Sequence, residues 1–450
     1  MAEHDDPNRY HTNTMTSPST TATKPVDSAT MSGQLAGRAM RSLRARWRSL
    51  QGHPLLNPVG LAEILREYRG GHPAAPSHRP HLVEAVDWLV RAQDAAPDGG
   101  IPRGYLVLYN PYYGTRGWQA SYPETTGYII PTLLEAAQHI ARPELTERAL
   151  RAARWEIDVQ LDSGAVQGGI IGEGRTPAIF NTGQVIFGWL AAFEATGDGR
   201  YADAARRAGA WLTSVLGPDG RWQQGESDFA RKDATLYNAR ASWALAEAGV
   251  RLERPEFRDA AARNLRFVAR SQAANGWFPN CCLSDPERPL LHTLAYTVRG
   301  LVEGGRVLES SGLVAAGARA AEALAATVRP NGFMPGRYRS DWTGPESWSC
   351  LTGEAQMANN WMRLSLITGQ TRWLEPVERV LTFVKRTQNR SSSDPGLRGG
   401  IKGSWPFGAE YSQYQMLNWA TKYFADALMR HEQIAAGSFA ARGAGTFRLA

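Results

Sequence analysis

The sequence predicts an all-α protein in which six helical hairpins form an (α/α)6 toroid. Two kinds of helix alternate along the chain, and a Gly-rich turn recurs between them at intervals of roughly 50–70 residues. Trp211 and Phe267 occupy equivalent places in successive copies, as do Gly276 and Gly332. No long alternation of apolar and polar residues competes with this pattern, so a helical repeat is the expected architecture.

The chain begins with two segments that differ from the repeats. Residues 1–35 are rich in Ser, Thr, Asp, Asn and Pro, which predicts a disordered tail. Apolar residues then recur at helical spacing among five arginines, at Met40, Leu43, Trp47 and Leu50. This pattern predicts a basic amphipathic helix and linker over 36–80. The helix either packs on the main domain, which is favoured, or contacts a membrane surface or a protein through Arg38–Leu50.

Residues 81–435 contain the repeats, and the two kinds of helix differ in which faces are apolar. One kind ends in Gln or an equivalent and carries Arg, Ala and Glu on one face, as in residues 202–212, so we expect it outside. The other kind is apolar nearly all round, as in residues 185–193, and should form an inner ring. The inner helices are expected to begin near Tyr122, Asn181, Tyr237, His292, Thr352 and Met416. Residues 436–450 are expected to be a flexible tail.

Composition excludes several classes of protein. The 450 residues are 43% hydrophobic, which allows a large core, but the apolar runs are too short to cross a bilayer. Cys281, Cys282 and Cys350 are too few for a disulfide scaffold and no signal-peptide pattern is present, so a cytoplasmic location is expected. The net charge of +7 lies partly in the arginine-rich segment, and no nucleic-acid-binding motif accompanies it. No cofactor is predicted, because no phosphate-binding or dinucleotide glycine motif occurs.

Two groups of toroidal proteins resemble this chain. The repeated element, clearest as Gln272-Ala-Ala-Asn-Gly276-Trp277, resembles the repeat of terpenoid cyclases and prenyltransferases. The six-hairpin layout is similar to that of toroidal glycoside hydrolases, sugar epimerases and polysaccharide lyases. These resemblances imply the fold over about 81–435 and leave the activity open, because the fold supports many chemistries. The chain lacks the Asp-x-Asp-Asp cluster of class II terpene cyclases, and a zinc site from the cysteines and His292 is disfavoured.

The first turns of the inner helices supply the candidate site. In a toroid these turns line one mouth, where free N–H groups and aromatic rings suit an acidic sugar. His292 opens an inner helix and Tyr296 follows one turn later on the same face, so these two with Tyr237 and Glu124 are the predicted catalytic residues. Arg240 and Asn238 are predicted to hold an acidic group. The other predicted substrate-binding residues are Asn181, Gln184, Tyr122, Trp118, Trp277, Gln356, Trp405 and Trp419.

Several alternatives stay open on sequence alone. Acid–base chemistry on a uronic saccharide, by a lyase or an epimerase, is slightly favoured over glycoside hydrolysis. Hydrolysis would need two facing carboxyl groups, and the candidates are Glu124, Asp233, Glu354 and Glu410. The pairs Ser121/Glu124 and Asn181/Gln184 also have the spacing of helix-capping boxes, and His292 also suits a core position. A non-catalytic toroid that binds a glycan or a protein, and an isoprenoid-handling toroid, are the other functional classes. The sequence does not indicate an oligomeric state.

Overall fold

The computed structural model describes residues 52–222, 224–225, 236–282 and 285–437. The predicted tail over 1–35, the basic helix Arg38–Leu50 and nearly all of 436–450 lie outside these ranges. The described part is mostly helical, with thirteen α-helices and a few short strands. None of its helices combines the length and hydropathy that crossing a bilayer requires.

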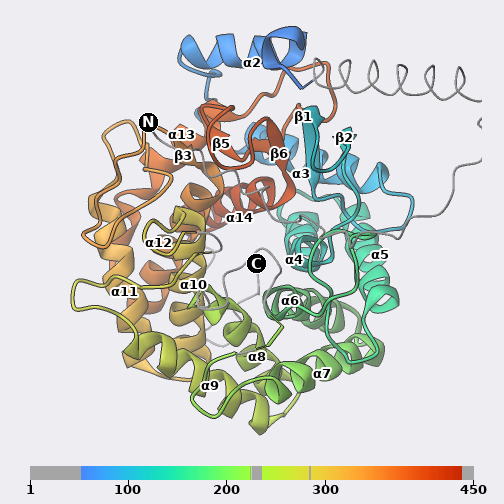
Figure 1. Ribbon diagram of the computed structural model, residues 1–450, viewed down its shortest axis with the longest axis vertical. Coiled ribbons are helices and arrows are strands. Elements are labelled where there is room, and N and C mark those ends of the chain that lie inside the picture. Colours follow the sequence, from blue (N-terminus) through green and yellow to red (C-terminus); the bar gives the residue numbers. More distant parts are fainter. Residues whose placement is uncertain (1–51, 223, 226–235, 283–284, 438–450) are drawn as a thin grey trace, which may run out of the picture.

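Within the described residues, six inner helices form a closed ring around the axis of the molecule (Figure 1). Each inner helix contacts the next one, and the last returns to contact the first. Their first three turns are almost completely buried, as expected of helices that are apolar nearly all round. The inner helices are α4 (Pro123–His139), α6 (Ile179–Thr196), α8 (Ala239–Arg251), α10 (Leu291–Val307), α12 (Leu351–Thr368) and α14 (Asn418–Ala435).

A second layer of helices surrounds this ring, which confirms the predicted (α/α)6 toroid. The outer helices bury small residues against the ring, as α9 does with Ala260 and Ala261, and they direct charged residues to solvent. The first outer helix packs against the last inner helix, so the two ends of the toroid meet. The outer helices are α3 (Arg79–Asp94), α5 (Glu144–Val159), α7 (Gly199–Ser214), α9 (Pro255–Arg270), α11 (Ser311–Ala326) and α13 (Val377–Thr387).

Short strands between the helices were not predicted from the sequence. A four-stranded antiparallel sheet has the order β2-β1-β6-β4, and a two-stranded ribbon joins β3 to β5. The bounds are β1 (Gly104–Asn110), β2 (Thr115–Trp118), β3 (Ser349–Cys350), β4 (Ile401–Lys402), β5 (Ser404–Trp405) and β6 (Gln415–Leu417). Because β1 pairs with β6, the larger sheet connects the first hairpin to the last.

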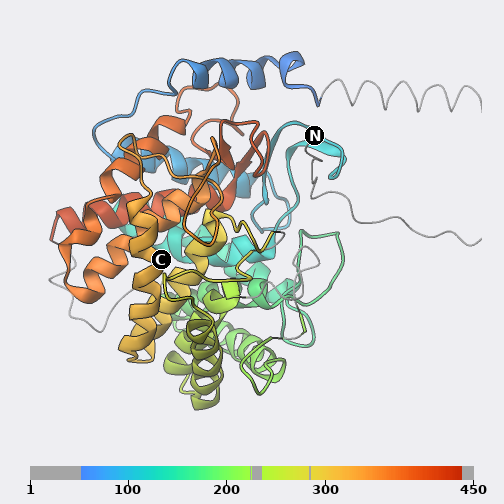
Figure 2. The ribbon, with the colours of Figure 1, turned by 60° about the vertical axis from the view of Figure 1, so that its left-hand side comes forward.

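One α-helix and three short 3-10 helices complete the described chain. Figure 2 shows α2 (Pro58–Tyr68) lying outside the ring. The buried ammonium group of Lys402 fastens it there, through ion pairs with Glu63 (3.0 Å) and Glu67 (2.7 Å). The 3-10 helices are η1 (Pro54–Leu56), η2 (Leu236–Asn238) and η3 (Thr371–Leu374).

The glutamine of the repeated element joins neighbouring hairpins. The Gln272 side-chain amide donates to the carbonyl of Gly276 in its own turn (2.9 Å) and to that of Ala316 in α11 (2.8 Å). Gln160 connects its turn to α7 in the same way, and Gln388 connects its turn to α3. The Gln388 bridge therefore closes the ring between the last hairpin and the first.

Replacing Gln388 by Ala should lower the free energy of unfolding by about 1–3 kcal/mol, because buried carbonyl groups lose their donor. Denaturant unfolding followed by circular dichroism measures this. The control is Gln370→Ala, which removes an exposed glutamine and should change stability little. Equal stability of the two variants would contradict a structural role for the bridge.

Candidate active site

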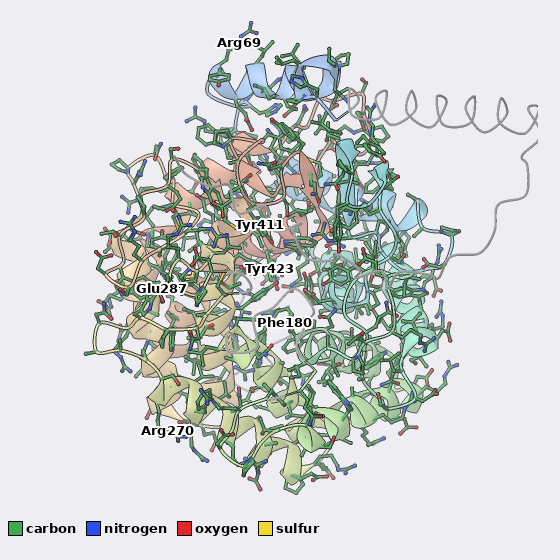
Figure 3. The ribbon with its side chains drawn as sticks, in the orientation of Figure 1. Arg69, Phe180, Arg270, Glu287, Tyr411 and Tyr423 are labelled. Carbon is green, nitrogen blue, oxygen red and sulfur yellow. The ribbon has the colours of Figure 1, made fainter. Side chains whose placement is uncertain are left out.

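The first turns of the inner helices meet around the axis, where Phe180, Tyr411 and Tyr423 lie close to one another in the view of Figure 3. Glu124 is in the first turn of α4, and His292 is in the first turn of α10. These helices are three places apart in a ring of six, so the two side chains come from opposite walls. A ligand on the axis would therefore have one of them on each side.

Glu124 is the acidic group of this site. The hydroxyl of Tyr122, the residue that precedes α4, donates a hydrogen bond to the Glu124 carboxylate. Burial raises the pKa of Glu124 to about 7, although the Tyr122 bond and the charges of Arg103 and Arg240 act in the opposite direction. Asn181 lies beside the Tyr122 hydroxyl on the neighbouring helix. A carboxyl group that titrates near neutral pH is suited to take and return a proton.

The pairs Ser121/Glu124 and Asn181/Gln184 do not form the helix-capping boxes that their spacing allows. Ser121 donates its hydroxyl hydrogen bond to Asp98 (2.8 Å), and no side chain caps α4. Helix α6 begins at Ile179, so Asn181 lies inside the helix and donates instead to the Gln167 carbonyl (2.9 Å). The polar residues of these first turns are therefore available for other contacts.

His292 is buried against aromatic rings. Its ring centroid is 4.6 Å from that of Tyr296 and 5.5 Å from that of Tyr411. Burial lowers the pKa of His292 to about 3, the nearby Gln356 side chain opposes this, and the charge of Arg240 adds to it. The imidazole is thus neutral near pH 7, as the sequence predicts, but burial rather than the helix N-terminus is the main cause. Its Nδ1 has no hydrogen-bond partner in the part of the chain described.

Arg240 places a buried positive charge at the axis. Its Nε donates to Gln184 Oε1 (2.6 Å), and no carboxylate of the described residues forms an ion pair with it. Aromatic rings surround the guanidinium at 5.2–6.0 Å from their centroids, which partly offsets the cost of burying the charge. These rings belong to Tyr128, Phe187, Trp243, Tyr296 and Tyr423. An anionic group of a ligand would complete this environment.

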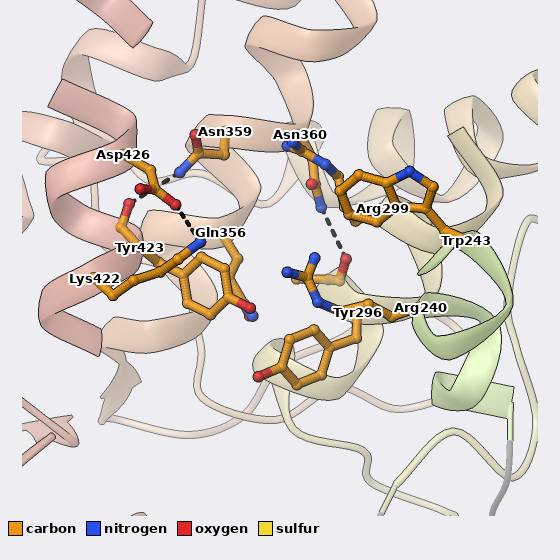
Figure 4. A pocket seen from close by; sticks show the side chains of 11 residues that line it. Arg240, Trp243, Tyr296, Arg299, Gln356, Asn359, Asn360, Lys422, Tyr423 and Asp426 are labelled. Atoms are coloured by element: carbon orange, nitrogen blue, oxygen red, sulfur yellow. Dashed lines mark hydrogen bonds and ion pairs between the residues drawn. The ribbon is translucent and has the colours of Figure 1, made fainter. Parts of the chain in front are cut away.

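Four further predicted residues lie among or beside these groups. Tyr237 packs its ring 5.4 Å from that of Phe180. Asn238 is buried, and its Oδ1 has no hydrogen-bond partner among the residues described. Gln356 is buried beside the side chains of His292 and Tyr423, the second of which lies next to it in Figure 4. Trp419 donates to the Tyr411 hydroxyl (3.1 Å). The Asn238 side-chain oxygen is therefore one that a saccharide hydroxyl could bond.

The structure does not bring Trp118, Trp277 and Trp405 into this cluster. Each of these tryptophans packs against other aromatic side chains in the shell around the ring. Their centroids lie 5.1–5.4 Å from those of their partners, which are Trp88 and Tyr105, Trp342, and Phe383. A stacking role for these three tryptophans on a sugar gains no support from their placement.

Two of the predicted partner carboxyl groups, Glu354 and Glu410, lie in the described residues, and both are engaged away from Glu124. Glu354 is fully buried and accepts hydrogen bonds from Ser349 Oγ (2.5 Å) and Met334 N (2.9 Å). Glu410 pairs with Arg337 (2.6 Å). Asp233 lies outside the described residues. Burial raises the pKa of the Cys281 and Cys350 thiols to about 12, and His292 does not belong to the group of converging metal-type ligands in the described ranges.

Sequence reasoning missed several residues of the site. Tyr128 and Tyr423 lie one turn after Glu124 and Trp419, so the spacing that led from His292 to Tyr296 would have found them. Lys422 does not lie four residues after any of the predicted site residues, so this spacing would not have indicated it. Arg103 lies in the loop before β1, with its guanidinium 4.9 Å from the Trp419 ring. No local pattern in the sequence marks it.

The chain was compared with known proteins. No family model and no curated protein matches it. Among solved structures, an unsaturated glucuronyl hydrolase specific for heparin superposes with a TM-score of 0.62 at 17% identity, over 79% of this chain and 97% of that one. A cellobiose 2-epimerase from Bacillus thermoamylovorans gives 0.61 at 10% identity, over 82% and 98%. A polysaccharide lyase gives 0.52 at 14% identity, over 70% and 92%.

The chain has the (α/α)6 toroid fold. At these identities the likeness establishes the architecture and leaves the activity of this toroid to be argued from its own residues.

Replacing Tyr122 by Phe removes a hydrogen bond that stabilises the ionised Glu124 carboxylate. The pKa of Glu124 should therefore rise above about 7. Nuclear magnetic resonance titration of the labelled Glu124 carboxyl carbon measures this pKa directly. Tyr201→Phe, on the outer helix α7, serves as the control and should leave the midpoint unchanged. A midpoint that stays the same or falls in Tyr122→Phe would show that the bond does not stabilise the carboxylate.

Proposed function

We propose that this toroid is an enzyme that acts on an acidic saccharide by proton transfer, with lyase or epimerase chemistry ahead of glycoside hydrolysis. The observation that carries the proposal is the placement of Glu124 and Tyr122 on one wall of the ring and of His292 and Tyr296 on the opposite wall. The names of similar structures agree with this class, since they include an epimerase, a polysaccharide lyase and glucuronyl hydrolases.

Arg240 supports an acidic substrate. Its charge is buried without a carboxylate partner among the described residues, so a uronate carboxylate would be its natural counter-ion. Removing a proton from the carbon next to a carboxylate places negative charge on that carboxylate, and a fixed guanidinium beside it stabilises this charge. Asn238, with its unpaired side-chain oxygen, would bind a sugar hydroxyl.

The ionised Glu124 carboxylate would take the proton from that carbon. In an epimerase, a proton then returns to the opposite face of the same carbon, and Tyr296 is placed to give it because it lies on the wall opposite Glu124. Burial raises the pKa of Tyr296, so its hydroxyl stays protonated until then. In a lyase, a carbon–carbon double bond forms instead as the neighbouring carbon–oxygen bond breaks, and the leaving oxygen takes its proton from the Tyr296 hydroxyl. His292, whose pKa of about 3 makes it a weak base, would bind a hydroxyl rather than accept the reacting proton.

The alternatives have less support. A two-carboxylate hydrolase needs a partner for Glu124 that Glu354 and Glu410 do not supply. Hydrolysis of an unsaturated uronide is the second candidate, because several structures similar in fold are named for that activity. An isoprenoid pocket would be dry and apolar, whereas this axis carries Arg240 and Lys422. A non-catalytic binder would not need a carboxyl group that titrates near neutral pH.

The decisive experiment incubates the protein with uronic and neutral oligosaccharides in deuterium oxide and in water enriched with heavy oxygen. An epimerase incorporates deuterium at carbon without cleaving the chain, and a lyase releases a product with ultraviolet absorbance. A hydrolase places heavy oxygen in its product. Mass spectrometry separates these results, and absence of any change across the panel would favour the non-catalytic binder.

Glu124→Gln should lower kcat/KM by about 10²–10⁴-fold and remove the inflection near pH 7, because the amide cannot exchange a proton. The pH–rate profile of the variant and of wild type measures both effects. Glu287→Gln changes an exposed carboxylate and should behave as wild type. Retention of the inflection in Glu124→Gln would assign proton transfer to another group.

His292→Ala should raise KM more than it lowers kcat, and the inflection near pH 7 should persist because it belongs to Glu124. Steady-state kinetics across pH, with thermal unfolding of the same sample, tests this. Loss of the inflection would make His292 the titrating group. A lower melting temperature with unchanged KM and kcat would make it a core residue.

A further inference from the structure

Helix α2 buries its acidic residues and exposes its apolar ones. Glu63 and Glu67 are at most 8% exposed, and both form ion pairs with the fully buried Lys402. On the other side of the helix, Leu65 is 48% exposed and Tyr68 is 87% exposed. A surface helix of a globular protein normally has the reverse arrangement, with its apolar stripe against the core. The outer face of α2 therefore has the composition of a surface that binds a partner.

This apolar surface begins in η1, directly before α2. Leu55 and Leu56 are 62% and 60% exposed, and Ala62, between them and the end of α2, is also exposed. Four of the six exposed large hydrophobic side chains in the described ranges lie in this segment, which is outside the ring (Figure 2). We call these four the α2 apolar patch, and they are Leu55, Leu56, Leu65 and Tyr68.

The exposed charges of the same segment are positive. Residues 52–78 contain two acidic side chains, Glu63 and Glu67, and both are buried. At the C-terminal end of α2, Arg69 is exposed and Arg66 is half-buried. The segment that carries the α2 apolar patch therefore presents arginine beside leucine and tyrosine, without an exposed carboxylate of its own.

The sequence that leads into the patch has the same composition. No acidic residue occurs from Ser28 to Ala62, and five arginines lie between Arg38 and Arg48. The apolar residues at helical spacing among these arginines lie outside the described residues, so only their sequence enters the argument. Apolar side chains among cations are the combination that binds the interface of a bilayer with anionic lipids.

We propose that the α2 apolar patch is a docking surface for bilayers that contain anionic lipids. The leucines and Tyr68 enter the boundary between head groups and acyl chains, and the arginines attract the lipid phosphates. Residues 36–51 of the same chain fit the patch less well, because their arginines would lie near Arg66 and Arg69 with no exposed acid of this segment between them. A second copy of the chain meets the same repulsion. The surface lies outside the ring, so the proposal does not depend on the function proposed for the axis.

Vesicle flotation of the full chain tests the proposal. Vesicles of phosphatidylcholine mixed with phosphatidylglycerol are compared with vesicles of phosphatidylcholine alone. The chain should float with the mixed vesicles more than with the neutral ones, and added salt should weaken this binding because it screens the arginines. Absence of flotation, or equal flotation with the two kinds of vesicle, would overturn the proposal.

Two matched variants locate the binding surface. Leu65→Ser should weaken binding to the mixed vesicles by roughly 10-fold, and adding Tyr68→Ser should weaken it further. Val250→Ser, on α8, changes a side chain that is 47% exposed and should bind as wild type does. All three side chains are exposed, so thermal unfolding should stay nearly unchanged. Equal binding of wild type and the Leu65→Ser, Tyr68→Ser variant would show that the patch is not the docking surface.

Thiol labelling of Leu65→Cys shows what covers the patch. The native cysteines are buried and should react slowly. Leu65→Cys should react in buffer as fast as Val250→Cys, and the mixed vesicles should slow the first reaction alone. Slow labelling of Leu65→Cys in buffer would overturn the proposal. It would assign the patch to the chain's own residues if the rate is independent of protein concentration, and to a second copy if the rate falls with concentration.

Discussion

The repeated glutamines Gln160, Gln272 and Gln388 each join a turn to the next outer helix, and the inner helices pack inside the frame that these hydrogen bonds help to hold. Gln272 shows the pattern, with one bond to its own turn and one to the next outer helix. Held in this way, the inner helices approach until their backbones touch. A Cβ atom on Gly183 would lie 2.6 Å from the Ala241 Cα, and one on Gly300 would lie 2.3 Å from the carbonyl carbon of Ala239. This close approach brings the first turns, with their polar side chains, to the axis.

Burial at that axis has opposite effects on acids and bases. Removing water disfavours whichever form is charged, so the same environment raises the pKa of Glu124 to about 7 and lowers that of His292 to about 3. One group therefore titrates near neutral pH while its neighbour on the opposite wall stays neutral. Aromatic rings and Gln184 surround the guanidinium of Arg240 there. The opposite pKa shifts of Glu124 and His292 therefore follow from desolvation and not from a sequence motif.

The repeat period and the apolar character of alternate helices were enough to predict the toroid, because both are local properties of the chain. The spacing from His292 to Tyr296 likewise predicted a contact that the structure has. The role of Arg103 and the pairing of β1 with β6 were not predicted, because both depend on contacts that form only when the two ends of the toroid meet. The role of Trp277 depends on the path of its loop, and spacing does not reveal that path. Sequence alone also could not separate a capping residue from one inside the first turn, as at Asn181.

The seam between α3 and α14 has a consequence for biosynthesis. Among the helices of the ring, α3 emerges from the ribosome first, and its buried side chains, such as Leu82 and Leu89, belong against α14, the ring helix that emerges last. Five hairpins can assemble into an open arc during translation, but that arc keeps an apolar edge uncovered until α14 is released. Trp419, Lys422 and Tyr423 reach the axis in the same final step. A nascent chain therefore completes its candidate site and covers this apolar edge in the same step.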